Sequence, residues 1–172
     1  IDVRDYIDIV QIMKQYDLGP NGSMIMANDL IASKIDNLQN EIDNVNPDYL
    51  IVDTPGQIEL FAYRASGPFI IQNLNVEEKV SIFLHDGSLI TSPTNFVSIA
   101  LLATSVKLRL GLSQINVLTK TDLIQDKIKD ILKWSTNMAS LEDALAKDAD
   151  GENYALATNI LRSLNLGGFA QG

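Results

Sequence analysis

Residues 53–59 (Asp-Thr-Pro-Gly-Gln-Ile-Glu) carry side chains that could act on a terminal phosphate. Asp53 follows a short apolar run, where a carboxylate can hold Mg²⁺ directly or through water. Gly56 allows a backbone N–H to approach a phosphate closely. Gln57 can orient a water molecule for in-line attack, and Glu59 can polarise that water. Taken alone, the segment is explained equally well as an ordinary strand-to-helix turn capped by its Asp and Thr.

Residues 119–122 (Thr-Lys-Thr-Asp) form a second segment with recognisable chemistry. The carboxylate of Asp122 could accept hydrogen bonds from both N1–H and N2–H₂ of guanine, a pair of donors that adenine lacks. The aliphatic stem of Lys120 could lie along the face of the base. In isolation, a solvated turn with Asp122 capping the next helix is the better explanation. In combination the two segments favour a functional site over two ordinary turns, because both follow apolar runs and occur in this order.

The elements that would position these residues alternate between strands and helices. Short apolar runs predict buried strands at residues 49–52, 80–84 and 114–118. Helical spacing of apolar residues predicts helices over 23–45, 57–74 and 94–110, two or three further helices between 126 and 164, and a short helix within 3–16, with a break at 18–22. This alternation predicts an α/β fold, a three-layer sandwich with a mainly parallel sheet flanked by helices. Since sheets typically have about 5–6 strands, we expect strands to be missing from both ends.

Polar residues follow each predicted strand, and we expect them to meet at one edge of the sheet. Asp53, Asp86 and residues 119–122 stand at these ends, and ligands of open parallel sheets bind outside the carboxyl ends of the strands. An acidic edge would repel an anion unless a divalent cation lay between them, which again favours Mg²⁺ with a phosphorylated substrate. His85, beside Asp86, is expected to be a hydrogen-bonded residue of this edge and not a ligand.

The composition of the chain excludes several classes of function. Its 172 residues include 13 Lys+Arg and 22 Asp+Glu, for a net charge of -9, so direct nucleic-acid binding is not expected. The chain has no Cys and one His, which excludes disulfides, thiolate sites and His-rich metal sites. The longest apolar stretch, residues 96–106, is shorter than the roughly 20 residues that span a bilayer, and no membrane association is expected. Because it begins with Ile1 and lacks a leader, we expect the chain to be part of a longer protein.

The sequence resembles the GPN-loop GTPases over about residues 1–124. The resemblance is carried by residues 1–5, 18–22, 53–59, 108–111 and 119–122. A Gly-Pro-Asn triplet is a weak signal alone, but upstream of Asp-Thr-Pro-Gly-Gln-Ile-Glu it is highly specific. The resemblance implies a GTPase fold of the P-loop NTPase type in a single domain, residues 1–172, with the Gly-Pro-Asn insertion at about 17–46 and a helical C-terminal part at about 125–166. It also implies a cytoplasmic homodimer that hydrolyses GTP to GDP and phosphate as a molecular switch.

The resemblance also implies roles for individual residues. The loop of Gly19, Pro20 and Asn21 would reach into the partner's site, where Asn21 contacts the terminal phosphate. Mg²⁺ would be the cofactor, served by Asp53 and by Asp2, and Asp5 would lie with Asp2 in the first switch. Gly56 would contact the γ-phosphate, and Gln57 and Glu59 would act on the attacking water. The guanine base would be bound by Thr119, Lys120 and Asp122. Eukaryotic relatives are linked to RNA polymerase assembly, which makes a protein client an expectation as well.

Three departures from the family pattern leave an alternative open. The sequence shows neither a Gly-x-x-x-x-Gly-Lys-Ser/Thr phosphate loop nor the family's Ser-Ala-Lys-type loop, and position 119 is Thr where Asn is usual. We favour a chain that is part of a complete GTPase. The alternative is a truncated relative that has lost hydrolysis and acts as a non-catalytic dimeric assembly scaffold. A third interpretation, an ATPase with the same strand order, is disfavoured by residues 120–122.

Overall fold

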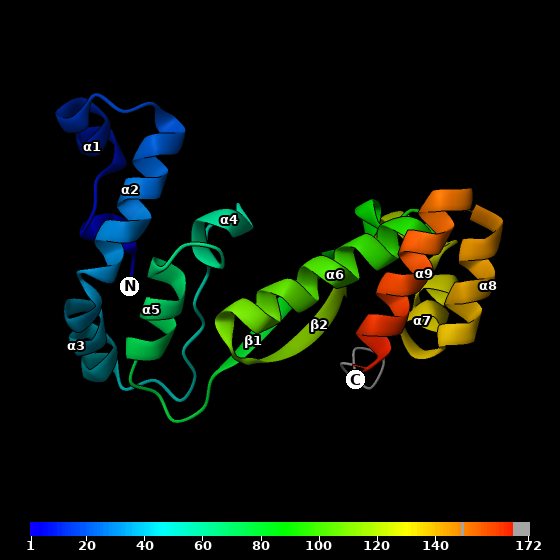
Figure 1. Ribbon diagram of the computed structural model, residues 1–172. Coiled ribbons are helices and arrows are strands. Elements are labelled where there is room, and N and C mark those ends of the chain that lie inside the picture. The colour runs from blue at the N-terminus through cyan, green and yellow to red at the C-terminus, as the bar shows by residue number, and fades with distance from the viewer. Residues whose placement is uncertain (149, 167–172) are drawn as a thin grey trace. The chain divides into compact units, whose positions relative to one another are not determined.

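In the computed structural model the chain forms two compact units (Figure 1). The first unit comprises Ile1–Glu78 and the second Lys79–Gly172. The structure describes residues 1–148 and 150–166. Within these ranges, no helix combines the length and the apolar character needed to cross a membrane.

The first unit is entirely helical in its regular structure. Its elements are η1 (Val3–Asp5), α1 (Ile9–Tyr16), α2 (Pro20–Ala32), α3 (Ile35–Val45), α4 (Ile58–Phe61) and α5 (Ser66–Asn73). Helix α1 begins where the Asp8 carboxylate accepts hydrogen bonds from the N–H groups of the next turn. Helix α2 packs against α1, α4 and α5. Their buried apolar side chains, with those of α3, form the core of this unit: Ile12, Ala27, Ile35, Leu38, Ile42, Leu60, Phe61, Ala62 and Ile70.

The predicted break at residues 18–22 is only partly correct. The chain does turn before Gly19, which is the N-cap of α2, but Pro20 is the first residue of the helix. Proline favours this position because its fixed φ suits a helix and its missing N–H would have no partner there. The Gly-Pro-Asn triplet is therefore the start of a helix and not an open loop.

The single helix predicted over residues 23–45 is wrong, because the structure contains two helices there. The N–H groups of Ser33 and Lys34 bond to the carbonyls of Leu30 and Ile31, three residues back, at 3.0 and 2.9 Å. The Ser33 hydroxyl also donates to the Leu30 carbonyl at 2.6 Å. These contacts close α2 and allow α3 to begin at Ile35.

The helix predicted over residues 57–74 is likewise divided, into α4 and α5. Gly67 explains the packing at the junction, because a Cβ at this position would lie 2.0 Å from the Phe61 carbonyl oxygen. Only a glycine allows the first turn of α5 to approach the end of α4 this closely. Gly67 and Pro68, expected to disturb a long helix, lie in the first turn of a new one.

The strand predicted at residues 49–52 is also wrong. The segment forms no strand, and its apolar side chains are exposed, with Tyr49 and Ile51 accessible over 89% and 91% of their surface. A strand needs a neighbouring strand to bond its N–H and C=O groups. In the part of the chain that the structure describes, the two strands present pair with each other, so residues 49–52 have no ladder.

The second unit contains a parallel pair of strands and the remaining described helices. Its elements are β1 (Val80–Asp86), η2 (Gly87–Leu89), α6 (Pro93–Leu110), β2 (Ser113–Thr119), η3 (Thr121–Ile124), α7 (Ile128–Thr136), α8 (Met138–Asp148) and α9 (Gly151–Leu166). These confirm the strands predicted at 80–84 and 114–118, the helix at 94–110 and the further helices between 126 and 164. Helix α6 connects the strands and lies along one face of the sheet (Figure 1). The register pairs Asp86 with Thr119, so both strands end at the same edge.

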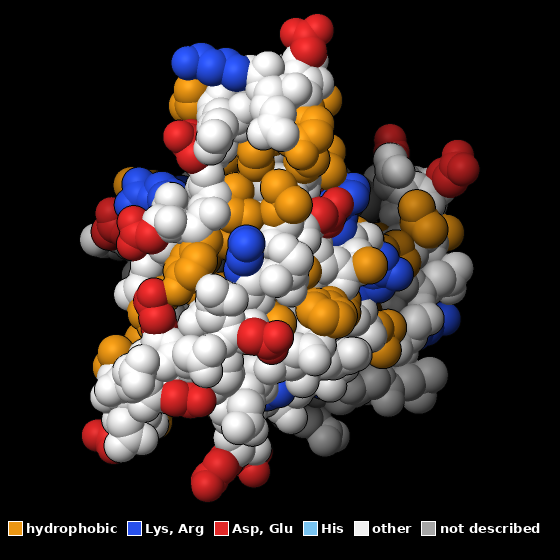
Figure 2. All heavy atoms as spheres, turned by 90° about the vertical axis from the view of Figure 1, so that its left-hand side faces the viewer, with side chains coloured by type: hydrophobic (Ala, Val, Ile, Leu, Met, Phe, Trp, Pro, Cys, Tyr) orange, Lys and Arg blue, Asp and Glu red, His pale blue; other side chains and the backbone are white. Residues whose placement is uncertain are grey.

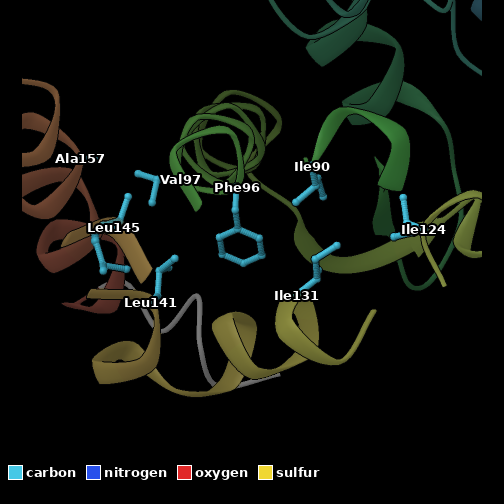
Figure 3. Packing of buried hydrophobic residues seen from close by; sticks show 9 residues of the cluster. Ile90, Phe96, Val97, Ile124, Ile131, Leu141, Leu145 and Ala157 are labelled. Carbon is cyan, nitrogen blue, oxygen red and sulfur yellow. The ribbon is translucent and has the colours of Figure 1, made fainter. Parts of the chain in front are cut away.

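A hydrophobic cluster holds α6 against the C-terminal helices (Figure 3). Phe96 of α6 points between Leu141 of α8 and Ile131 of α7, and its ring meets Trp134 edge-on with centroids 6.0 Å apart. The buried members of the cluster are Ile90, Phe96, Val97, Ile124, Ile131, Leu141, Leu145, Ala157 and Leu161. Ile124 anchors η3 to this cluster, so residues 119–122 lead into and begin a turn that is fixed by core packing.

Candidate functional site

The predicted site residues divide between the two units. The first unit carries Asp2, Gly19, Pro20, Asn21, Asp53, Gly56, Gln57 and Glu59, and the second carries Thr119, Lys120 and Asp122.

Asp2 is engaged in a bidentate ion pair with Arg4. The Arg4 Nε and Nη2 atoms donate to the Asp2 carboxylate at 2.9 and 2.5 Å, and the Arg4 backbone N–H donates at 2.9 Å. These hydrogen bonds lower the pKa of Asp2 from 3.8 to about 2, the side-chain bonds contributing most. Metal coordination by Asp2 would therefore require Arg4 to leave.

Gly19, Pro20 and Asn21 lie at the exposed N-terminal end of α2. The first N–H groups of a helix have no acceptor within it, and the helix dipole adds partial positive charge there. Both the backbone N–H and the hydroxyl of Ser23 bond to the Gly19 carbonyl, at 3.0 and 2.9 Å. Ser23 is fully buried, so this contact fixes the start of the helix and leaves Asn21 on the surface.

Residues 53–59 run along the surface up to the short helix α4. Asp53, Gly56, Gln57 and Glu59 are all exposed, and Gln57 is the N-cap of α4. Apart from its chain neighbours, no described atom would lie within 4 Å of a Cβ at Gly56. Its φ is not in the left-handed region either. The described structure therefore gives no steric reason for glycine at this position, whereas close approach of a ligand would give one.

A polar network that sequence reasoning missed connects α2 to this segment. The buried side-chain amide of Asn28 donates to the Leu60 carbonyl and, at 2.9 Å, to the Ser66 hydroxyl. Next to it, Arg64 Nε and Nη2 donate to the two carboxylate oxygens of Asp29 at 3.1 and 2.6 Å. The hydrogen bond from Arg64 is the largest cause of the lowered pKa of Asp29. The one available signal was a polar residue, Asn28, within the apolar stripe of a helix.

A second contact connects the N-terminal segment to α3. The hydroxyl of Tyr6 donates to the Glu41 carboxylate, and this hydrogen bond raises the pKa of Tyr6. Polar side chains thus join two segments to helices α2 and α3. Residues 2–6, which precede these helices in the sequence, are joined to α3, and residues 58–66, which follow them, are joined to α2.

In the second unit, Lys120 is held at the edge of the sheet by Asp86. The Lys120 Nζ lies 2.5 Å from Oδ2 of Asp86, and Ser88 donates to Oδ1 of Asp86 through its N–H and its hydroxyl at 2.9 and 2.6 Å. The Lys120 and Ser88 hydrogen bonds lower the pKa of Asp86. Lys120 has φ 53° and ψ 38°, a left-handed conformation that is uncommon for a long side chain and is concentrated at functional sites.

Thr119 and Asp122 flank Lys120 in different environments. The Thr119 hydroxyl donates to the His85 carbonyl at 3.2 Å, which joins the ends of β1 and β2. Asp122 is exposed in the first turn of η3. Of the residues predicted to meet at one edge of the sheet, Asp86 and residues 119–122 do so. Asp53 belongs to the first unit and follows no strand, so its part of the prediction is not confirmed.

The acidic residues do not form a closed metal cage. Among the described residues, no group of three or more His, Asp or Glu side chains is placed to hold a metal ion. Figure 2 shows the acidic side chains scattered over one face, with hydrophobic side chains between them. One exposed carboxylate, such as Asp53, fits the usual Mg²⁺ site of nucleotide-binding proteins, where substrate phosphates and water supply the other ligands.

Comparison with known proteins gives consistent similarities. A family model described as "Conserved hypothetical ATP binding protein" matches residues 1–170. GPN-loop GTPase 3 of Saccharomyces cerevisiae is 36% identical over 166 residues, which cover 94% of this chain and 60% of the relative. GPN-loop GTPase 3 of Debaryomyces hansenii is 31% identical over 169 residues, covering 95% and 62%. The chain therefore spans about three fifths of the length of these relatives.

A solved structure shows the same fold. The crystal structure of a GTPase in apo form from Pyrococcus abyssi matches with a TM-score of 0.79 and 26% identity, over 94% of this chain and 64% of that one. This similarity confirms the predicted α/β fold class of the P-loop NTPase type, with helices around a parallel sheet.

Proposed function

Since the chain belongs to the GPN-loop GTPase family, we propose that the protein carrying it binds GTP and hydrolyses it to GDP and phosphate. The similar proteins are named as GTPases. The observation that carries the proposal is the pairing of Lys120 with Asp86 at the common edge of β1 and β2, two residues before Asp122.

Recognition of guanine is the proposed role of residues 119–122. Asp122 accepts hydrogen bonds from N1–H and N2–H₂ of the base, and the stem of Lys120 lies along its face. Thr119 keeps the two strand ends together through its bond to the His85 carbonyl. The family description names ATP, whereas this pattern of donors and acceptors favours GTP.

Phosphoryl transfer to water is the proposed role of the first unit's exposed residues. Gln57 and Glu59 orient and polarise the attacking water, and the N–H of Gly56 contacts the γ-phosphate. Asp53 would hold Mg²⁺, and Asp2 would be a second ligand if Arg4 released its carboxylate. A metal ion held there with the nucleotide would neutralise charge on the phosphate oxygens.

The quaternary and cellular parts of the proposal follow from family resemblance. The protein acts as a homodimeric switch of one GTPase domain per chain, in the cytoplasm, with a protein client such as an RNA polymerase assembly intermediate. Gly19, Pro20 and Asn21 reach the partner's site, where Asn21 contacts the terminal phosphate. The alternative is a non-catalytic dimeric scaffold of the same fold that has lost nucleotide hydrolysis.

Titration calorimetry with GTP and ATP, each with Mg²⁺, followed by a phosphate-release assay, tests the proposal on the complete gene product. We expect binding that is selective for GTP and slow release of phosphate. Selective binding without phosphate release would favour the scaffold. Selectivity for ATP would contradict the role of Asp122.

A further inference from the structure

The short helix α4 depends on α2 for its position. A helix of four residues has almost no stability of its own, because nucleation is costly and few hydrogen bonds repay it. The Leu60 carbonyl lies in its last turn, where intrahelical donors are lacking. The buried Asn28 amide of α2 supplies a donor to this carbonyl and also donates to Ser66 at the start of α5.

The ion pair between Asp29 and Arg64 adds a second connection beside the first. Arg64 follows α4 in the chain, and both of its donating nitrogens meet the carboxylate of Asp29. Two parallel hydrogen bonds fix direction as well as distance. The pair is about 40% exposed on each side, so it contributes little to stability, and its geometric effect is the more important one.

The connected helix has two different faces. Leu60 and Phe61 are buried against the core of the unit, whereas Gln57 and Glu59 are exposed. Helix α2 runs from Gly19 and Pro20 at one end to Asn28 and Asp29 in its second half. One continuous helix therefore joins the Gly-Pro-Asn end to the element that begins at Gln57.

We propose that Asn28 and the Asp29–Arg64 pair are positioning residues that hold Gln57 and Glu59 in register with the N-terminal end of α2. This inference rests on the proposed GTP hydrolysis, and it adds residues that act through Gln57 and Glu59 without touching the nucleotide. A displacement of the Gly-Pro-Asn end is then transmitted along α2 to the residues that orient the attacking water.

Steady-state hydrolysis of GTP by the complete protein tests the proposal. Arg64→Gln and Asp29→Asn should each lower kcat about tenfold, with KM unchanged within about twofold, because misplacement of a positioned group slows the reaction and leaves binding intact. The double variant should be no slower than either single variant. The exchanged pair Asp29→Arg with Arg64→Asp should recover part of the loss. Asp43→Asn is the matched control, since Asp43 accepts a bond from Gln39 within α3 of the same unit.

Hydrogen exchange provides a readout that does not depend on turnover. Amides of residues 58–66 should exchange faster in Asp29→Asn than in the unaltered protein, while those of α3 should not change. Unchanged kcat in both single variants, or losses that multiply in the double variant, would overturn this inference alone. Absence of GTP hydrolysis by the unaltered protein would overturn the proposed function and this inference with it.

Discussion

The Nζ atom of Lys120 lies 2.5 Å from Oδ2 of Asp86, and the register of β1 and β2 places Asp86 opposite Thr119. The carboxylate also receives two hydrogen bonds from Ser88. A flexible lysine side chain is thus directed from both ends, by a left-handed backbone and by a fixed counter-ion. Such preorganisation lowers the entropic cost of placing its stem against a ligand.

Replacing Asp86 should weaken nucleotide binding indirectly, through Lys120, because Asp86 itself is not expected to contact the base. In Asp86→Asn the counter-ion of Lys120 is lost, and we expect the Kd for GTP to rise about fivefold, since an immobilised long side chain is worth about 1 kcal/mol. Titration calorimetry measures this. Glu142→Gln, which removes the partner of Arg162 in the same unit, is the control and should leave Kd unchanged. An unaltered Kd in Asp86→Asn would show that Lys120 needs no counter-ion.

Asp122→Asn should change the preferred base. The amide retains an acceptor for N1–H but presents a donor toward the 2-position, which suits the carbonyl of xanthine and not the amino group of guanine. We expect GTP affinity to fall roughly 100-fold or more and xanthosine triphosphate to become the better ligand. Competition binding measures both. Asp126→Asn, an exposed acid nearby, should keep the selectivity for GTP. Retained GTP selectivity in Asp122→Asn would exclude this base contact.

The second unit could be predicted from sequence because its signals are local. The runs at 80–84 and 114–118 are apolar and bounded by turn residues. They form neighbouring parallel strands that are connected in sequence by α6. Ser92 caps the start of α6, Pro93 is its first residue, and Gly111, with φ 66°, caps its end. These residue types are recognisable helix boundary signals in the sequence. The meeting of Asp86 with Lys120 followed from the parallel arrangement alone.

The first unit was harder to predict because its structure depends on distant partners. The run at 49–52 has the composition of a strand, but composition does not supply a neighbouring strand, and the side chains are exposed. Asn28 and Arg64 were missed because their partners are 32 and 35 residues away in sequence. Contacts of this kind follow from packing and leave no periodic pattern.

Gln57→Leu should separate binding from hydrolysis. The leucine cannot hydrogen-bond a water molecule, and Gln57 is exposed at the start of α4, so the fold should tolerate the change. We expect turnover to fall at least about tenfold with GTP affinity retained within about twofold. Phosphate release and calorimetry measure the two quantities. Gln72→Leu, at an exposed position of α5, is the control, and equal turnover in Gln57→Leu and the unaltered protein would remove Gln57 from the mechanism.

Gly67→Ala should destabilise the first unit. The added Cβ would lie 2.0 Å from the Phe61 carbonyl oxygen, so α4 and α5 must separate, at a cost of about 3 kcal/mol. Gly22→Ala is the control with the opposite sign. Its Cβ would make ordinary contact with Leu18 at 3.5 Å, and alanine within a helix gains roughly 0.5–1 kcal/mol over glycine. Urea unfolding measures both, and similar midpoints for the two variants would contradict the close approach.

His85 should make the stability of the second unit depend on pH in a defined window. The side chain is 8% exposed, and burial lowers its pKa below 6.5, only partly offset by the bond between Nε2 and Asn116 Oδ1 at 3.1 Å. Below pH 6.5 the unfolded chain therefore binds a proton that the folded chain resists. Stability should be constant above this pH and should fall as the pH decreases toward the folded-state pKa.

His85→Gln isolates this effect, because the chain contains one His and glutamine can still donate to Asn116. The pKa values of Asp2, Asp29 and Asp86 are lowered from the ordinary 3.8. These carboxyl groups therefore change the stability below about that pH, which is outside the window in which His85 titrates. Urea unfolding at pH 7.5, 6.5 and 5.5 should show a decline in the unaltered protein that is absent from the variant. Parallel declines in the two proteins would mean that His85 is protonated as readily in the folded state as in the unfolded chain.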